Sequence, residues 1–194
     1  MARSVTIIGV PEPTGGAIAG LLGERATMDT VVAGAAETRV APFLELTQAD
    51  WEAMVAGLRQ AFRAVQRSSA SLVERAAPGR MILVSSTAAV RPVQGATLAA
   101  TAGGFLTTLG QVAAVELGPN GITINVVAPG FVGDERFVDA TPLGRPASPG
   151  DVAEACAFIA SEAAAGVTGA VLAVDGGFSI TKSAGGSPLL APGE

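Results

Sequence analysis

Two serines at the end of an apolar run are the residues in this chain best placed to do chemistry. Ser85 and Ser86 follow the run Met81–Val84, and a second apolar run, Ile122–Ala128, stops at Pro129. The small residues between the runs predict strand, helix, strand. Sites in an open α/β sheet lie at the carboxyl ends of strands. The two hydroxyls either serve such a site or bond to the nearby backbone, and the pattern leaves both open.

The residue types that enzymes usually employ for proton transfer are almost absent. The chain has no histidine and no tyrosine, and its single lysine is Lys182, near the C-terminus. Histidine, lysine and tyrosine are common general acids and bases. Any chemistry would fall to carboxylates, to serine and threonine hydroxyls or to a bound cofactor.

The composition is typical of one domain with a sizeable core. Of 194 residues, 49% are hydrophobic and 15% are charged, so part of the apolar surplus is available to face a partner chain. The net charge of −5, without a basic cluster, argues against nucleic acid and anionic membranes. No apolar run reaches the length of about 18 residues that a membrane span needs, and the N-terminus is too short for a signal peptide. Cys156 is the lone cysteine, so the chain cannot form an internal disulfide. We expect no membrane span, no metal site and a cytoplasmic location.

A glycine-bearing loop follows the first apolar run. Val5–Gly9 predicts a buried parallel strand, and the loop leads into a helix over residues 15–24. Such a turn can cradle a dinucleotide pyrophosphate on free helix N–H groups. Here Pro11 and Pro13 remove two donors, because proline has no N–H. A plain strand-to-helix turn is the alternative interpretation.

The rest of the chain continues the alternation of strands and helices. Thr47, with Asp50 three residues on, is a good start for a long amphipathic helix. Ser148 before a proline is the start of another. The predicted elements are a second apolar run at 30–33 closed by Gly34, helices at 47–67 and 99–117, a helix from 148, and a last strand at 170–174, with an irregular segment at 133–140.

Seven segments carry a resemblance to a known family: IIGVPEPTGGAIAGLL at 7–22, VVAG at 31–34, PFLELTQADWEAMVAGLRQAF at 42–62, MILVSS at 81–86, NVVAPGFV at 125–132, PLGRPASPGDVAEACAFIAS at 142–161 and VTGAVLAVDGG at 167–177. Over residues 4 to 178 the chain resembles the short-chain dehydrogenase/reductase family. The motifs in the C-terminal half are the specific ones.

The resemblance implies the fold class: α/β, a Rossmann-like doubly wound parallel sheet in a single domain over 1–180, with a loose tail at 181–194. The region after the first strand is too short for family strands 2 and 3. The order 3-2-1-4-5-6-7 then becomes 1-4-5-6-7, about five strands, and the first strand becomes an edge. A right-handed crossover would place the helix at 15–24 on the opposite face from the family's helix, and the sequence leaves that face open.

The resemblance also assigns the catalytic places. In the family, a serine orients the substrate carbonyl, a tyrosine thirteen residues on transfers its proton, and a lysine four further on lowers the tyrosine pKa. From Ser86, the tyrosine and lysine places hold Ala99 and Gly103, and Gly57 holds the place of the family's helix asparagine. Only the serine is intact. Counting from Ser85 instead gives Leu98 and Ala102.

The cofactor motifs are altered as well. The family's Thr-Gly-x-x-x-Gly-x-Gly becomes Ile8-Gly9-x-x-x-Pro13-x-Gly15, and Asn-Asn-Ala-Gly becomes Val32-Ala33-Gly34. The lost strands hold the adenine half of the cofactor in the family. We expect no cofactor, with Gly9, Gly15 and Gly34 as remnants of the loop.

These changes favour a non-catalytic family member that acts through oligomerisation. It would pair with itself or serve as structural subunit of a heteromeric oxidoreductase beside an active member. The predicted contacts are helices 47–67 and 99–117 and strand 170–174, which are the family's subunit contacts. One alternative is an NAD(P)-dependent oxidoreductase in which Ser86 with Thr97 or Thr101 replaces the missing groups. The other is a small-ligand-binding regulatory module.

Overall fold

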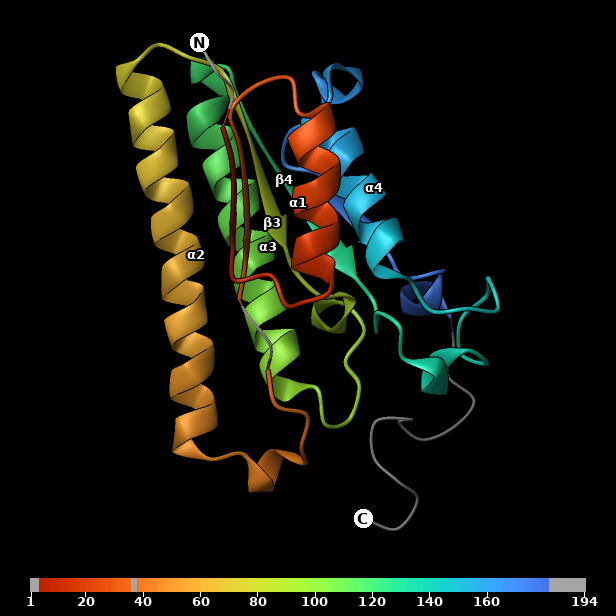
Figure 1. The fold of residues 1–194 in the computed structure, drawn as a ribbon. Coiled ribbons are helices and arrows are strands. Elements are labelled where there is room, and N and C mark those ends of the chain that lie inside the picture. The colour runs from red at the N-terminus through yellow and green to blue at the C-terminus, as the bar shows by residue number, and fades with distance from the viewer. Residues whose placement is uncertain (1–3, 36–37, 182–194) are drawn as a thin grey trace.

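Five parallel strands form one sheet between two layers of helices (Figure 1). The computed structural model describes residues 4–35 and 38–181. Across the sheet the strands keep their chain order: β1 (Val5–Ile8), β2 (Thr30–Gly34), β3 (Gly79–Val84), β4 (Ile122–Pro129) and β5 (Val171–Val174). This confirms the predicted reduced sheet, with β1 at one edge.

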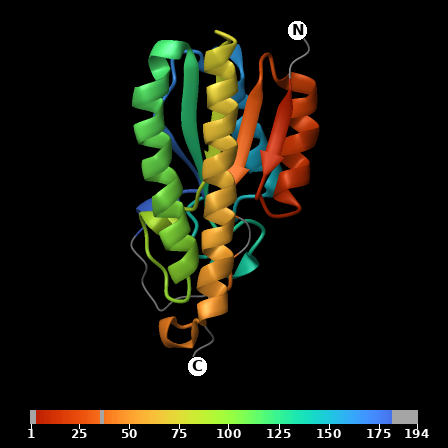
Figure 2. The same cartoon turned by 90° about the vertical axis from the view of Figure 1, so that its left-hand side faces the viewer.

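Two helices cover each face of the sheet. On one face lie α1 (Thr14–Arg25) and α4 (Pro149–Ala160), which pack on each other. On the other lie α2 (Gln48–Glu74) and α3 (Thr97–Leu117), side by side in Figure 2. Short 3₁₀ turns lie in the connections: η1 (Phe43–Glu45), η2 (Thr87–Ala89), η3 (Gly118–Asn120), η4 (Glu135–Phe137), η5 (Glu162–Ala164) and η6 (Phe178–Ile180).

The position of α1 answers the question of handedness that the sequence leaves open. The strands step in one direction across the sheet, so crossovers through opposite faces have opposite hands. Those through α2 and α3 are right-handed, and those through α1 and α4 are therefore left-handed (Figure 2). Ile18 and Leu22 of α1 are fully buried in a core shared with α4. Packing against α4 thus outweighs the usual preference for a right-handed connection.

The central strand β3 divides the core into two parts. All six of its residues are buried, as expected for a strand covered on both faces. Met81 and Leu83 pack in the core beneath α2 and α3, whereas Ile82 and Val84 pack in the core beneath α1 and α4. The edge strands β1 and β5 are only partly buried.

Both predicted helix starts are confirmed as capping boxes. Thr47 and Asp50 exchange hydrogen bonds at the start of α2, and Ser148 and Asp151 do so at α4. The predicted end of the long helix at 67 is wrong, because α2 continues to Glu74. Its last turns are held by Leu72, which is 2% exposed and belongs to the core.

Helix α3 has an apolar surface of its own. The segment Thr97–Asn120 is long and apolar enough, by length and composition alone, to cross a membrane, a criterion that core helices of globular domains also meet. In the fold it packs on β4 and α2. Phe105, Val112 and Val115 are nevertheless 41%, 52% and 79% exposed.

Candidate functional site

A cleft of about 710 Å³ opens at the carboxyl ends of the strands, where the sequence predicts a site. The loop after β1, the end of β2, Ser85 and Ser86, the first turns of α3 and the segment after β4 all contribute to its wall. The structure therefore brings together the predicted site residues Gly9, Gly34, Ser86, Ala99 and Gly103. Gly57 lies outside the cleft wall.

Both strand-end hydroxyls bond to nearby atoms of the chain. Ser86 Oγ accepts a hydrogen bond from the N–H of Ala88 at 3.2 Å. Ser85 Oγ donates to the carbonyl oxygen of Gly103 at 2.9 Å and lies 3.1 Å from Thr107 Oγ1. These contacts match the structural role that the sequence leaves open for the serines.

The tyrosine place offers no proton donor. Ala99 lies on α3 at the cleft wall and packs against a cluster formed by Phe131, Phe137 and Phe178. Its methyl side chain can neither give nor accept a proton. The proposed substitutes do not replace it: Thr101 Oγ1 donates to the carbonyl of Thr97 at 2.9 Å, and neither threonine lines the cleft.

The lysine and asparagine places are tightly packed. A Cβ added at Gly103 would lie 3.0 Å from the Ser86 carbonyl oxygen, 3.1 Å from Ala89 Cβ and 3.2 Å from Ser85 Oγ. A Cβ added at Gly57 would lie only 2.1 Å from the carbonyl oxygen of Ala35. At both places glycine lets α3 or α2 lie directly against the chain at the strand ends, with little or no room for a Cβ.

Three phenylalanines hold the segment after β4 against the domain. Phe131 and Phe137 stack with ring centroids 3.8 Å apart, and Phe178 meets both rings edge-on. Arg91 lies over the Phe178 ring and donates to the Phe178 carbonyl. The predicted irregular segment thus contains η4 and the buried Phe137. The sequence signal was weak: three of only seven phenylalanines, with Phe178 some forty residues after the other two.

The first amides of α1 bond within their own loop. Gly15 N–H donates to the Pro11 carbonyl at 2.9 Å, and Ala17 N–H donates to the Pro13 carbonyl at 3.1 Å. Between them, Gly16 N–H donates to the carboxylate of Glu12 at 3.0 Å. These are the groups that hold pyrophosphate in a dinucleotide-binding turn.

The charged side chains that line the cleft are acidic. They are Glu12 and Asp134, and no lysine or arginine lines the cleft in the ranges 4–35 and 38–181. Arg136 forms a two-point ion pair with Asp134, and its hydrogen bonds lower the pKa of that carboxyl. With the α1 amides engaged and no lysine or arginine in the cleft wall, the residues that the structure describes do not fit a dinucleotide cofactor.

The remaining reactive groups lie elsewhere. Among the described residues no three histidine, cysteine, aspartate or glutamate side chains gather as a metal site. Burial in the core raises the pKa of the Cys156 thiol to about 12, so it stays protonated at neutral pH.

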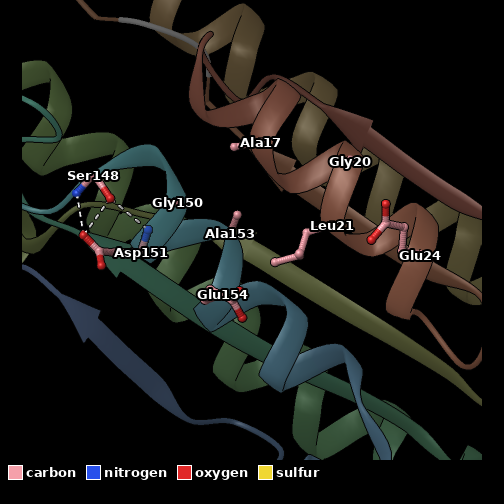
Figure 3. Close-up of a pocket in the computed structure, with 9 residues that line it drawn as sticks. All are labelled: Ala17, Gly20, Leu21, Glu24, Ser148, Gly150, Asp151, Ala153 and Glu154. Carbon is pink, nitrogen blue, oxygen red and sulfur yellow. Dashed lines mark hydrogen bonds between the residues drawn. The ribbon is translucent and has the colours of Figure 1, made fainter.

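A second hollow of about 460 Å³ lies between α1 and α4 (Figure 3). Small residues such as Ala17, Gly20 and Ala153 line it, together with the capping pair Ser148 and Asp151. The carboxylate of Asp151 is occupied by the cap and by Arg145. We therefore place the candidate site in the larger cleft.

Comparisons with known proteins identify the family of this chain. A family model described as Enoyl-(Acyl carrier protein) reductase matches residues 16–179. L-xylulose reductase from Bos taurus is 33% identical over 174 residues, which cover 82% of this chain and 71% of that protein. The chain belongs to the short-chain dehydrogenase/reductase family. The 3-oxoacyl-[acyl-carrier-protein] reductase of Chlamydia trachomatis is 28% identical, covering 80% of this chain and 67% of that protein.

Solved structures of family members have the same fold. Acetoin dehydrogenase YohF from Salmonella typhimurium superposes with a TM-score of 0.73 at 27% identity, covering 89% of this chain and 73% of that one. A 3-ketoacyl-(acyl-carrier-protein) reductase from Brucella melitensis, complexed with NADH, superposes with a TM-score of 0.81 at 18% identity. The match covers 92% of this chain and 98% of that one. The Rossmann-like class predicted from the sequence is confirmed. A cofactor is thus plausible for the family as a whole, and the expectation that this chain takes none stays a proposal.

Proposed function

We propose that this chain is a non-catalytic short-chain dehydrogenase/reductase that acts through association, as structural subunit of a heteromeric oxidoreductase with an active family member. The observation that carries the proposal is the pair Ala99 and Gly103 at the cleft wall. They stand where the family has its proton donor and its lysine. With no tyrosine or histidine in the chain, the proton step has no usual donor.

The relatives indicate which chemistry the active partner would perform. They are named as reductases and dehydrogenases, including L-xylulose reductase and 3-oxoacyl-[acyl-carrier-protein] reductase. The partner would carry an oxidoreductase activity of this kind, and this chain would stabilise the partner or complete its assembly.

Exposed apolar stripes on α2 and α3 support association. Trp51, Phe62 and Val73 recur every eleven residues along α2, about three turns, and are 48%, 40% and 41% exposed. On α3, Phe105 and Val112 lie about two turns apart and are 41% and 52% exposed. Large apolar side chains exposed in stripes are typical of protein interaction surfaces. These are the helices for which the sequence predicts subunit contacts.

Co-expression with complete family members of the same genome tests the proposal. We expect one of them to co-purify with this chain at fixed stoichiometry and to show more activity in the complex than alone. Phe62→Glu and Phe105→Glu should abolish co-purification, because each places a charge in an apolar contact. Ala19→Glu, at an exposed position of α1 on the other face, is the matched control and should leave the complex intact. Monomeric behaviour with every candidate would refute the proposal.

The cleft supports a second candidate function, a small-ligand-binding regulatory module. Its volume of about 710 Å³ is within the usual range for ligand pockets. Crystals soaked with a library of neutral fragments would test it. Density against Ser86 and Ala99, away from any subunit contact, would favour this function over association.

A further inference from the structure

The carboxylate of Glu12 lies over the start of α1. Its Oε2 accepts a hydrogen bond from Gly16 N–H at 3.0 Å. A Cβ added at Gly16 would lie 2.9 Å from Oε2, and one added at Gly15 would lie 2.8 Å from the Val10 carbonyl oxygen and 3.3 Å from Oε1. The carboxylate therefore occupies the space beside Gly16, and it shares the space beside Gly15 with the Val10 carbonyl.

In a dinucleotide-binding turn, the pyrophosphate fills that space and binds the first N–H groups of the helix. Free N–H groups at a helix start bind anions because they are unsatisfied and lie at the positive end of the helix dipole. Here the N–H groups of Gly15 and Ala17 already donate to the carbonyls of Pro11 and Pro13. The middle N–H, of Gly16, already has an anion as partner. The chain thus supplies its own negative group where the ligand's would bind.

Electrostatic repulsion by the Glu12 carboxylate also disfavours a phosphate group at this place. A pyrophosphate at this place would meet the Glu12 carboxylate at contact distance, where like charges repel. The other lining carboxylate, Asp134, is already paired with Arg136, and no lysine or arginine among the described lining residues pairs with Glu12.

We infer that Glu12 is a specificity-determining residue of the cleft, whose carboxylate takes the phosphate position at the start of α1 and excludes phosphate-bearing ligands such as NAD(P). The inference goes beyond the proposed function, because the outer faces of α2 and α3 can associate whether or not the cleft accepts a nucleotide. An experiment that refutes the inference on Glu12 therefore does not refute the proposed function, and the reverse also holds.

Calorimetric titration of the full chain with NADH and with inorganic pyrophosphate tests the inference. Wild type should show no saturable binding of either probe at millimolar concentration. Glu12→Ala removes both the charge and the obstruction, and should strengthen binding of both probes at least roughly tenfold. Glu12→Gln keeps the hydrogen-bond acceptor without the charge and should show a smaller gain. Glu74→Ala, an exposed carboxylate at the end of α2, should bind as wild type does.

The variants give a decisive result in each direction. Circular dichroism checks that each variant is folded. If Glu12→Ala does not fold, Glu12→Gln tests the inference instead, because glutamine can keep the hydrogen bond with Gly16. Equal behaviour of wild type and both Glu12 variants, including equal absence of binding, would overturn the inference. Micromolar binding of NADH by wild type would overturn it as well.

Discussion

Ser85 donates a hydrogen bond from its Oγ to the carbonyl oxygen of Gly103, at 2.9 Å. The bond ties the end of β3 to the α3 residue that occupies the lysine place. It also depends on the absence of a side chain at Gly103, since an added Cβ would approach Ser85 Oγ to 3.2 Å. The hydroxyl and the helix thus serve the packing of the domain at the place that the family resemblance assigns to the catalytic lysine.

Alanine substitution should lower the free energy of unfolding at Gly103 and raise it at the neighbouring Gly104. Gly103→Ala forces a methyl against the Ser86 carbonyl and Ala89, and should destabilise the chain by about 1–3 kcal/mol. A Cβ at Gly104 meets no other atom within 4 Å, so Gly104→Ala should stabilise α3 by about 0.5–1 kcal/mol. Urea unfolding measures both changes. Equal stabilisation by the two substitutions would mean that α3 does not approach β3 as closely as described.

Restoring the family's residues should not restore activity. Ala99→Tyr with Gly103→Lys supplies the proton donor and the lysine, but leaves the Glu12 carboxylate on the Gly16 amide at the start of α1. We expect no detectable oxidation of NADH or NADPH with carbonyl substrates of the relatives, such as L-xylulose or acetoin. The same assay on Ala99→Phe with Gly103→Lys is the control. Turnover by the tyrosine variant alone would show that the cleft still accepts the cofactor.

Phe137 should be the most costly aromatic residue to truncate. It is 1% exposed, stacks on Phe131 and meets Phe178 edge-on, so Phe137→Ala should cost about 3–5 kcal/mol. Phe43, 71% exposed, is the control, and its truncation should change stability by less than about 0.5 kcal/mol. Limited proteolysis should then cut the Phe137→Ala variant first between 131 and 147. Unchanged protection of that segment would contradict the account of the aromatic cluster.

The cap of α4 should make stability depend on acid pH. Hydrogen bonds from Arg145, and from the backbone and hydroxyl of Ser148, hold the pKa of Asp151 below its usual range. A lowered folded-state pKa stabilises the fold above the unfolded value of about 3.9, and this contribution is lost as the pH falls through the folded-state pKa. Asp151→Asn should therefore reduce the loss of melting temperature between neutral pH and strong acid. Asp139→Asn, at an exposed loop position, should follow wild type.

The sequence predicts the scaffold well, because the scaffold rests on local signals. Continuous apolar runs such as Met81–Val84 mark strands that are buried on both faces, and β3 covers that run. The pairs Thr47–Asp50 and Ser148–Asp151 are capping boxes in sequence and in structure. Cap residues act on amides two or three positions away, so their effect needs no knowledge of the fold.

The parts that the sequence does not predict depend on contacts between distant elements. The face taken by α1 follows from burial of Ile18 and Leu22 against α4, more than a hundred residues later. Phe137 and Phe178 meet only once the chain has folded. The direction of the Glu12 side chain follows from the turn around Gly15 and Gly16, and composition alone identifies only a glycine-bearing loop.

Native mass spectrometry of the co-expressed chains tests the central claim most directly. We predict an assembly that contains both this chain and a complete short-chain dehydrogenase/reductase of the same genome, and that dissociates when Phe62 and Phe105 are changed to glutamate. Masses of separate homomeric species for every such pair, with wild-type chains at micromolar concentration, would contradict the claim that this chain works as a partner of an active family member.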